Sequence, residues 1–192
     1  DARWGRVMES TGEDPYLNAR MAEAMVRGIQ GEGEHYEEHL GACTKHFAAY
    51  GAPTAGREYN NVELSERTLR EDYLPAYEAA IKAGSAMVMT SFNTLDRIPA
   101  TANQWLMRKV LREEMGFEGV LVSDYNAVGE LINHGVAQNK QEAAKQAIEA
   151  GTDLDMMGGC YITELENLVK SGQISEELID QAVLRILKLK NK

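Results

Sequence analysis

The sequence predicts an α/β fold with a parallel sheet, because short apolar runs alternate with amphipathic stretches along most of the 192 residues. Met89, Val122 and Leu154, which lie in three successive runs, are spaced by 33 and 32 residues. A (β/α)8 barrel of about 250 residues gives about 31 residues to each unit. We therefore predict a TIM-type (β/α)8 barrel, present here as a partial barrel of about four βα units. The expected strands are residues 43–50, 86–92, 119–123 and 152–156.

The amphipathic stretches predict helices whose ends carry recognisable signals. Residues 103–115 place apolar side chains on one face after Asn103, a candidate N-cap, and Gly116 follows as a candidate C-terminal cap. The last helix is expected to begin at Ser175, with acidic residues in its first turn and lysines in its last turn. Other helices are expected at residues 15–30, 65–83, 139–150 and 161–171, and a solvated loop at residues 31–40.

The number of expected strands has a consequence for the completeness of the fold. Four parallel strands cannot close a barrel, and an open parallel sheet leaves two unpaired edges. We therefore expect further chain, or a partner chain, to complete the barrel.

Composition limits the classes of partner. The 20 basic and 30 acidic side chains give a net charge of −10, which argues against nucleic acid or an anionic membrane surface as the main partner. No apolar run approaches the roughly 18 to 20 residues of a membrane span. Cys43 and Cys160 are too few for a disulfide framework and match no metal-binding spacing, so the redox compartment stays open. We expect no metal and no cofactor.

In a barrel of this kind the functional side chains lie at the C-terminal ends of the strands. Asp124 follows the apolar run of residues 119–122, where a carboxylate is costly unless it is hydrogen-bonded or used. Asp124 is therefore the best candidate for a nucleophile, a base or a metal ligand. The alternative is a helix N-cap, since a helix is expected to begin near Ala127.

Lys45 and His46 are adjacent basic residues in an otherwise apolar run. Neighbouring side chains of a strand point to opposite faces, so one of the two must point into the barrel. A buried cation there requires an anionic partner or a bound hydroxylated ligand. The alternative is that the strand ends before Lys45 and that both residues belong to a loop.

Two further segments offer ligand-binding side chains. Arg3, Trp4 and Arg6 lie in a loop that leads into a helix, where Arg can donate to a polyol and Trp can cover a sugar ring, although a surface cluster would look similar. At the end of the second expected strand, Met89 and Phe92 are candidate walls of a site, or else core residues.

Together these motifs resemble the catalytic barrel of glycoside hydrolase family 3, the β-glucosidase and β-xylosidase group. They occur in the family's order and span nearly the whole chain. The resemblance implies that residues 1–192 are the C-terminal part of one catalytic barrel domain, and that the first barrel strands and the family's C-terminal α/β-sandwich domain lie outside them. The matching segments are residues 1–6, 12–16, 45–47, 56–60, 64–75, 88–93, 116–125 and 150–156.

The resemblance also implies a reaction, the cleavage of terminal non-reducing β-linked glucose with retention. Asp124 is implied to be the nucleophile that forms a covalent glycosyl intermediate, helped to stay charged by nearby cations. The implied substrate-binding residues are Arg6, Lys45, His46 and Met89 around the −1 sugar and Tyr125 on the +1 side.

The chain departs from the family pattern in two respects. Phe92 stands where many members have a Tyr whose hydroxyl steadies the nucleophile. The acid/base Glu that retention requires usually comes from the second domain, so we expect the remainder of the enzyme or a complementing chain to supply it, and this chain alone to be inactive. A periplasmic or secreted location is favoured over a cytoplasmic one.

Other functions stay open at this point. A β-xylosidase or another exo-β-glycosidase of the same family has the same motifs. A non-catalytic sugar-binding or assembly subunit has the same fold without turnover. An unrelated barrel enzyme, such as an aldolase, would use Lys45 as a Schiff base.

Overall fold

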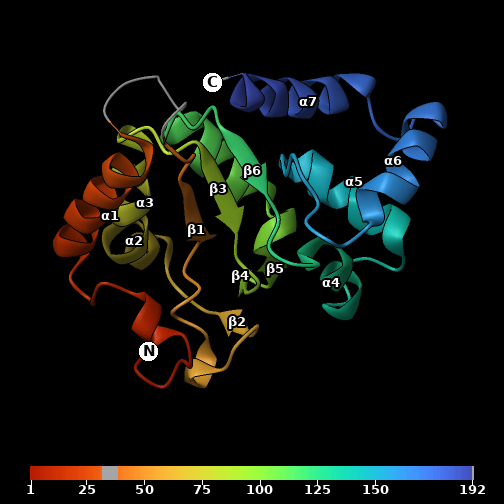
Figure 1. Cartoon of the computed structure of the whole chain (residues 1–192). Helices are drawn as coiled ribbons and strands as arrows, with labels where there is room; N and C mark the ends of the chain where they lie inside the picture. The colour runs from red at the N-terminus through yellow and green to blue at the C-terminus, as the bar shows by residue number, and fades with distance from the viewer. Residues whose placement is uncertain (32–38, 192) are drawn as a thin grey trace.

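The computed structural model of the chain describes residues 1–31 and 39–191. Its main sheet consists of β1 (Cys43–Phe47), β3 (Met87–Thr90) and β6 (Val120–Val122), all parallel and in that order. Leu154 adds a parallel bridge to Val122 at the far edge. The strands follow one another in chain order with helices between them, as Figure 1 shows. This arrangement agrees with a partial (β/α) barrel.

The helices fall close to the predicted ranges. In the expected loop, residues 32–38 lie outside the described part of the chain. No helix within residues 1–31 and 39–191 is long and apolar enough to cross a membrane. The helices are α1 (Pro15–Gln30), α2 (Glu66–Thr68), η4 (Leu69–Tyr73), α3 (Leu74–Lys82), η6 (Trp105–Glu114), α4 (Ala127–Asn133), α5 (Lys140–Ala150), α6 (Cys160–Lys170) and α7 (Glu176–Lys190), with single 3-10 turns η1 (Val7–Glu9), η3 (Thr54–Gly56) and η5 (Ala100–Ala102).

All four predicted strands are longer than the observed ones, and the first and last have an identifiable reason. The run expected at 43–50 stops pairing at Phe47, because the register shifts after Thr44 and Ala49 has a positive φ of 61°. The run expected at 152–156 contributes only the bridge at Leu154, since no strand in the described residues pairs with its outer edge.

The helix predicted at 65–83 is observed as three consecutive segments. Its middle segment, η4, is wound as a π-helix. Pro75 has no backbone N–H to donate and its ring crowds the carbonyl four residues earlier, which accounts for a wide turn just before it. The predicted cap of η6 is confirmed, because the Asn103 side chain accepts a hydrogen bond from the backbone N–H of Leu106 at 3.0 Å.

A second, small sheet was not predicted. It consists of β2 (Asn61–Val62), β4 (Thr94–Leu95) and β5 (Ile98–Pro99), too short to show an alternating pattern. Asp96 and Arg97 have φ of 52° and 64°, the left-handed backbone of a tight hairpin turn between β4 and β5. This sheet fixes the chain after β1 to the chain after β3.

The core lies on the helix-facing side of the main sheet. Val88 and Leu121 are fully buried there in one cluster with residues of η6. Met89 pairs with Val122 across the neighbouring strands, so both lie on the opposite side, which a complete barrel encloses. A second apolar cluster joins α4, α5, α6 and α7.

A buried ionic cluster fastens the last helix to the sheet. The Asp153 carboxylate, 1% exposed, accepts from Arg112 of η6 at 2.7 Å and from Arg185 of α7 at 2.8 Å. It also accepts from the backbone N–H of Leu121 in β6 at 2.8 Å. One carboxylate therefore connects η6, β6 and α7.

Asp153→Asn is expected to lower the free energy of unfolding by about 3–5 kcal/mol, because it leaves two partly buried guanidinium groups without a counter-charge. Chemical denaturation of the full-length protein measures this change. Glu166→Ala, which breaks an exposed ion pair with Lys170 on α6, is the matched control and is expected to have little effect. Equal effects of the two substitutions would contradict the role assigned to Asp153.

Candidate active site

The segment that carries Asp124 is held in place by residues 154–156, which lie beside the end of β6. Ser123 N–H donates to the carbonyl of Leu154 at 2.9 Å, and Asn126 N–H donates to the carbonyl of Met156 at 2.8 Å. The Ser123 hydroxyl accepts from Met156 N–H and donates to the Asp124 carbonyl, both at 2.9 Å. Asp124 is thus positioned by hydrogen bonds on both sides of its own backbone.

The Asp124 side chain is buried, and its two oxygens differ. Oδ1 accepts a hydrogen bond from the backbone N–H of Tyr125 at 2.6 Å. Oδ2 is buried and has no hydrogen-bond partner among the described residues. No side chain caps the N-terminus of α4, so the alternative of a helix cap at Asp124 does not hold. The carboxylate presents one unpartnered oxygen at the C-terminal end of β6.

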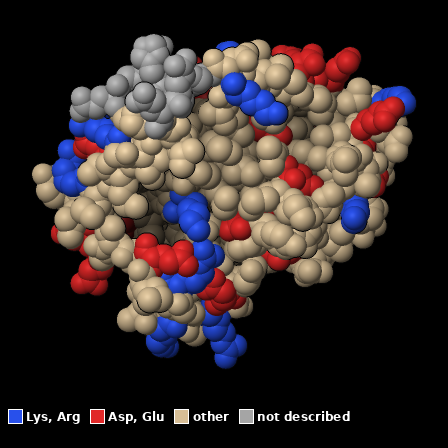
Figure 2. All heavy atoms as spheres, in the orientation of Figure 1, with Lys and Arg blue, Asp and Glu red and all other residues tan. Residues whose placement is uncertain are grey.

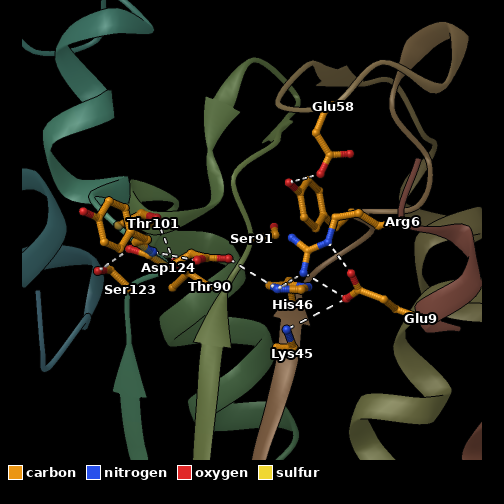
Figure 3. Close-up of polar contacts among 12 residues, drawn as sticks. Arg6, Glu9, Lys45, His46, Glu58, Thr90, Ser91, Thr101, Ser123 and Asp124 are labelled. Carbon is orange, nitrogen blue, oxygen red and sulfur yellow. Dashed lines mark hydrogen bonds and ion pairs between the residues drawn. The ribbon is translucent and has the colours of Figure 1, made fainter. Parts of the chain in front are cut away.

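Basic side chains lie to one side of this oxygen, with His46 nearest to it, as Figure 3 shows. His46 Nε2 lies 3.3 Å from Asp124 Oδ2 and 3.2 Å from Arg6 Nη2. Arg6 forms a two-pronged ion pair with Glu9, at 2.8 and 2.9 Å. Lys45 Nζ lies 3.9 Å from the same Glu9 carboxylate. The four predicted residues Arg6, Lys45, His46 and Asp124 therefore form one cluster. Glu9 connects Arg6 to Lys45, and His46 connects Arg6 to Asp124.

Burial determines the charge of the imidazole. Burial, followed by the positive charges of Arg6 and Lys45, lowers the pKa of His46 from 6.5 to about 3, so the ring is neutral near pH 7. Arg6 can only donate, so the imidazole nitrogen that faces it is the acceptor. The 3.3 Å approach to Asp124 is therefore not an ion pair, and it leaves Oδ2 unpartnered.

Burial also raises the pKa of Asp124 above its usual value. The N–H of Tyr125 and the charges of Arg6 and Lys45 act in the opposite direction. The predicted influence of the cations is thus present, but desolvation outweighs it. A partly desolvated carboxylate is a better nucleophile than a solvated one, provided that nearby cations keep it ionised.

The other predicted residues lie around this cluster. Tyr125 is 60% exposed and follows Asp124 directly, so its ring stands at the open side of the site. Met89 is partly buried on the sheet face that it shares with Val122. Phe92 is buried against Tyr59 at 4.4 Å and Tyr50 at 5.8 Å between ring centroids, and it presents no hydroxyl.

Sequence reasoning missed two residues of the cluster. Glu9 holds both Arg6 and Lys45, and its opposite charge three residues after Arg6 was the available signal. Ser123 joins the two strand ends through its hydroxyl, and no sequence pattern marked it.

A hollow adjoins the charged cluster. A cavity of about 440 Å³ lies among α1, α3, β1 and the N-terminal segment, with Glu9, Lys45 and His46 in its lining. Asp124 lies outside that cavity. Figure 2 shows basic and acidic side chains together at the edge of a hollow on this face.

Fold and site together define a partial barrel with a buried carboxylate and a group of cations at its strand ends. The model of the Glycosyl hydrolase family 3 N terminal domain matches residues 1–189. The chain belongs to glycoside hydrolase family 3.

Individual relatives are similar over nearly the whole chain. A periplasmic beta-glucosidase of Salmonella typhimurium is 43% identical over 99% of this chain and 25% of its own length, and a beta-xylosidase of Formosa agariphila is 43% identical over 100% and 28%. The crystal structure of a beta-glucosidase from Listeria innocua in complex with glucose matches with a TM-score of 0.97 and 59% identity, over 100% of this chain and 27% of that one. The chain spans about a quarter of the length of these relatives.

The neutral state of His46 predicts how stability depends on pH. Below pH 6.5 the unfolded chain binds a proton on this side chain, whereas the folded protein binds it only near pH 3. The contribution of His46 to the free energy of unfolding is therefore complete above pH 6.5 and falls as the pH is lowered toward 3. NMR titration of the imidazole, assigned by comparison with His46→Gln, is expected to show no protonation down to about pH 3. A pKa near 6.5 would contradict this assignment.

Proposed function

We propose that the protein carrying residues 1–192 is a retaining exo-β-glycosidase that removes a terminal non-reducing β-linked glucose. The observation that supports this most directly is the buried Asp124 carboxylate, with one oxygen on a backbone N–H and the other unpartnered. Retention requires a carboxylate that can bond to the anomeric carbon. The beta-glucosidases of Salmonella and Listeria are the relatives that favour glucose.

In the first step Asp124 Oδ2 attacks the anomeric carbon, and the bond from that carbon to the leaving oxygen breaks. The leaving oxygen takes a proton from an acid/base Glu, which we assign to the remainder of the enzyme or to a complementing chain. In the second step the same Glu removes a proton from water, which displaces Asp124 from the sugar. Tyr125 N–H stays on Oδ1 throughout and holds the carboxylate in its orientation.

The side chains around Asp124 are assigned to the sugar. Arg6 and Lys45 are cationic donors, suited to hydroxyl oxygens of the sugar in the −1 subsite. Neutral His46 lies between Arg6 and Asp124, and we assign it to the same sugar. We assign Met89 to the same sugar and the exposed ring of Tyr125 to the +1 side, where an aromatic face covers an apolar sugar surface.

We propose a periplasmic or secreted location. The support for this is the Salmonella relative, which is named as a periplasmic enzyme.

The covalent intermediate can be trapped. A 2-deoxy-2-fluoro-β-glucoside is expected to inactivate the full-length protein and to label Asp124, as peptide mass spectrometry will show, because the fluorine slows hydrolysis of the intermediate. The corresponding xyloside, tested in parallel, is expected to react more slowly; faster reaction would favour a β-xylosidase, which the Formosa relative supports. Asp124→Asn is the control and is expected to take no label.

Other outcomes separate the remaining functions. A label on a different carboxylate would overturn the assignment of Asp124. Sugar binding that survives Asp124→Asn, with no turnover by the wild type, would favour a non-catalytic subunit. Borohydride trapping of a carbonyl substrate on Lys45 would favour an aldolase.

Residues 1–192 alone are expected to hydrolyse aryl β-glucosides negligibly, because the acid/base is assigned outside them. A rate assay on the isolated chain, checked for folding by circular dichroism, measures this. Normal turnover would mean that Glu58, Glu63 or Glu130 serves as an internal acid. Burial and the charge of Asp124 raise the pKa of Glu130, which makes it the first residue to substitute in that case.

A further inference from the structure

Tyr50, just after β1, lies at the centre of the residues around the site. It is 2% exposed. Its ring lies 5.1 Å from the rings of both Trp4 and His46 and 5.8 Å from Phe92, with tilted or edge-on geometry. It therefore contacts the N-terminal segment, β1 and the chain after β3 at once.

Arg6 lies over the face of this ring. The central carbon of its guanidinium is 5.3 Å from the Tyr50 ring centroid, within the range of a cation–π interaction. Arg6 thus has three neighbours that define its position: Glu9, His46 and Tyr50. Two of them, Tyr50 and His46, also contact each other.

The Tyr50 ring is itself fixed by Glu58. Its hydroxyl donates to Glu58 Oε1 at 2.6 Å. Burial, and then this hydrogen bond, hold the pKa of the phenol above its usual range, so the hydroxyl keeps the proton that it donates. Glu58 Oε2 is buried without a hydrogen-bond partner among the described residues, so Tyr50 is the one side chain there that binds this carboxylate.

The loop that carries Glu58 is packed closely against the segment that carries Arg6. Gly56 has a positive φ of 69°, and a Cβ atom there would lie 2.8 Å from the Arg3 Cβ and 2.9 Å from the Arg3 carbonyl carbon. The loop is therefore held against residues 3–4, and Glu58 reaches Tyr50 from a position fixed by this contact.

We propose that Tyr50 and Glu58 are positioning residues that set Arg6 for the sugar in the −1 subsite. The inference rests on the proposed function. Neither residue touches the reacting atoms: Glu58 fixes the Tyr50 hydroxyl, and the Tyr50 ring fixes the guanidinium. Displacement of the guanidinium weakens its contact with a sugar hydroxyl, which lowers kcat/KM without removing the nucleophile.

A mutant cycle in the full-length protein tests this. Tyr50→Phe keeps the ring but frees it from Glu58, and it is expected to lower kcat/KM for an aryl β-glucoside about tenfold or more. In an Arg6→Ala background the same substitution is expected to change kcat/KM by less than about twofold, because the group that it positions is gone. Tyr161→Phe is the control. It removes a tyrosine hydroxyl that donates to the backbone carbonyl of Thr152, away from the site, and it is expected to leave kcat/KM unchanged.

Glu58 provides a second, independent pair of variants. Glu58→Gln keeps an oxygen that accepts from Tyr50 and is expected to retain most of kcat/KM. Glu58→Leu has a similar shape without an acceptor and is expected to reproduce the loss seen in Tyr50→Phe. Melting temperatures of all variants identify any that fail to fold. If Tyr50→Phe is among them, the comparison of Glu58→Gln with Glu58→Leu tests the inference instead.

Two results would overturn the inference. One is a loss from Tyr50→Phe that is equally large with and without Arg6, which indicates a structural role alone. The other is equal activity of Glu58→Gln and Glu58→Leu. If the wild type is labelled on Asp124 and the variants give either of these results, only this inference is contradicted. If the wild type is neither labelled nor active, the proposed function itself is contradicted.

Discussion

The Asp124 carboxylate is buried at the end of β6, and within residues 1–31 and 39–191 it accepts a single hydrogen bond, from the backbone N–H of Tyr125. Burial disfavours its charge, and the cations Arg6 and Lys45 oppose that effect. Glu9 pairs with both cations, so the local group contains two cations, two carboxylates and a neutral imidazole. A desolvated carboxylate needs this compensation to remain ionised, and the arrangement of the surrounding loops serves to provide it.

The geometry of the parallel sheet brings these charged side chains together. Parallel strands in chain order bring their C-terminal ends to one edge, which places residues from β1 and β6 beside each other although they are far apart in sequence. Hydrogen bonds through Ser123 join the end of β6 to residues 154–156. Asp153 connects β6 to η6 and α7. β6, which carries Asp124 at its end, is therefore also held in place on the side away from the site.

Much of the fold and part of the site could be predicted from the sequence. Asp124 was recognisable because a carboxylate after a buried strand is costly unless it is hydrogen-bonded or used. The spacing of the apolar runs indicated a barrel. The small sheet was not predictable, because strands of two residues leave no periodic pattern. Tyr50 was read as part of a strand, and its contacts with Trp4, Arg6 and Glu58 depend on loops that meet only in the folded chain.

The central claim is that Asp124 attacks through the oxygen that the protein leaves unpartnered. A crystal structure of the full-length protein after inactivation by a 2-deoxy-2-fluoro-β-glucoside tests it most directly. The predicted result is a bond from the anomeric carbon to Oδ2 of Asp124, with Tyr125 N–H still on Oδ1 and Arg6, Lys45 and His46 on the sugar. A bond through Oδ1, or to another residue, would contradict the account.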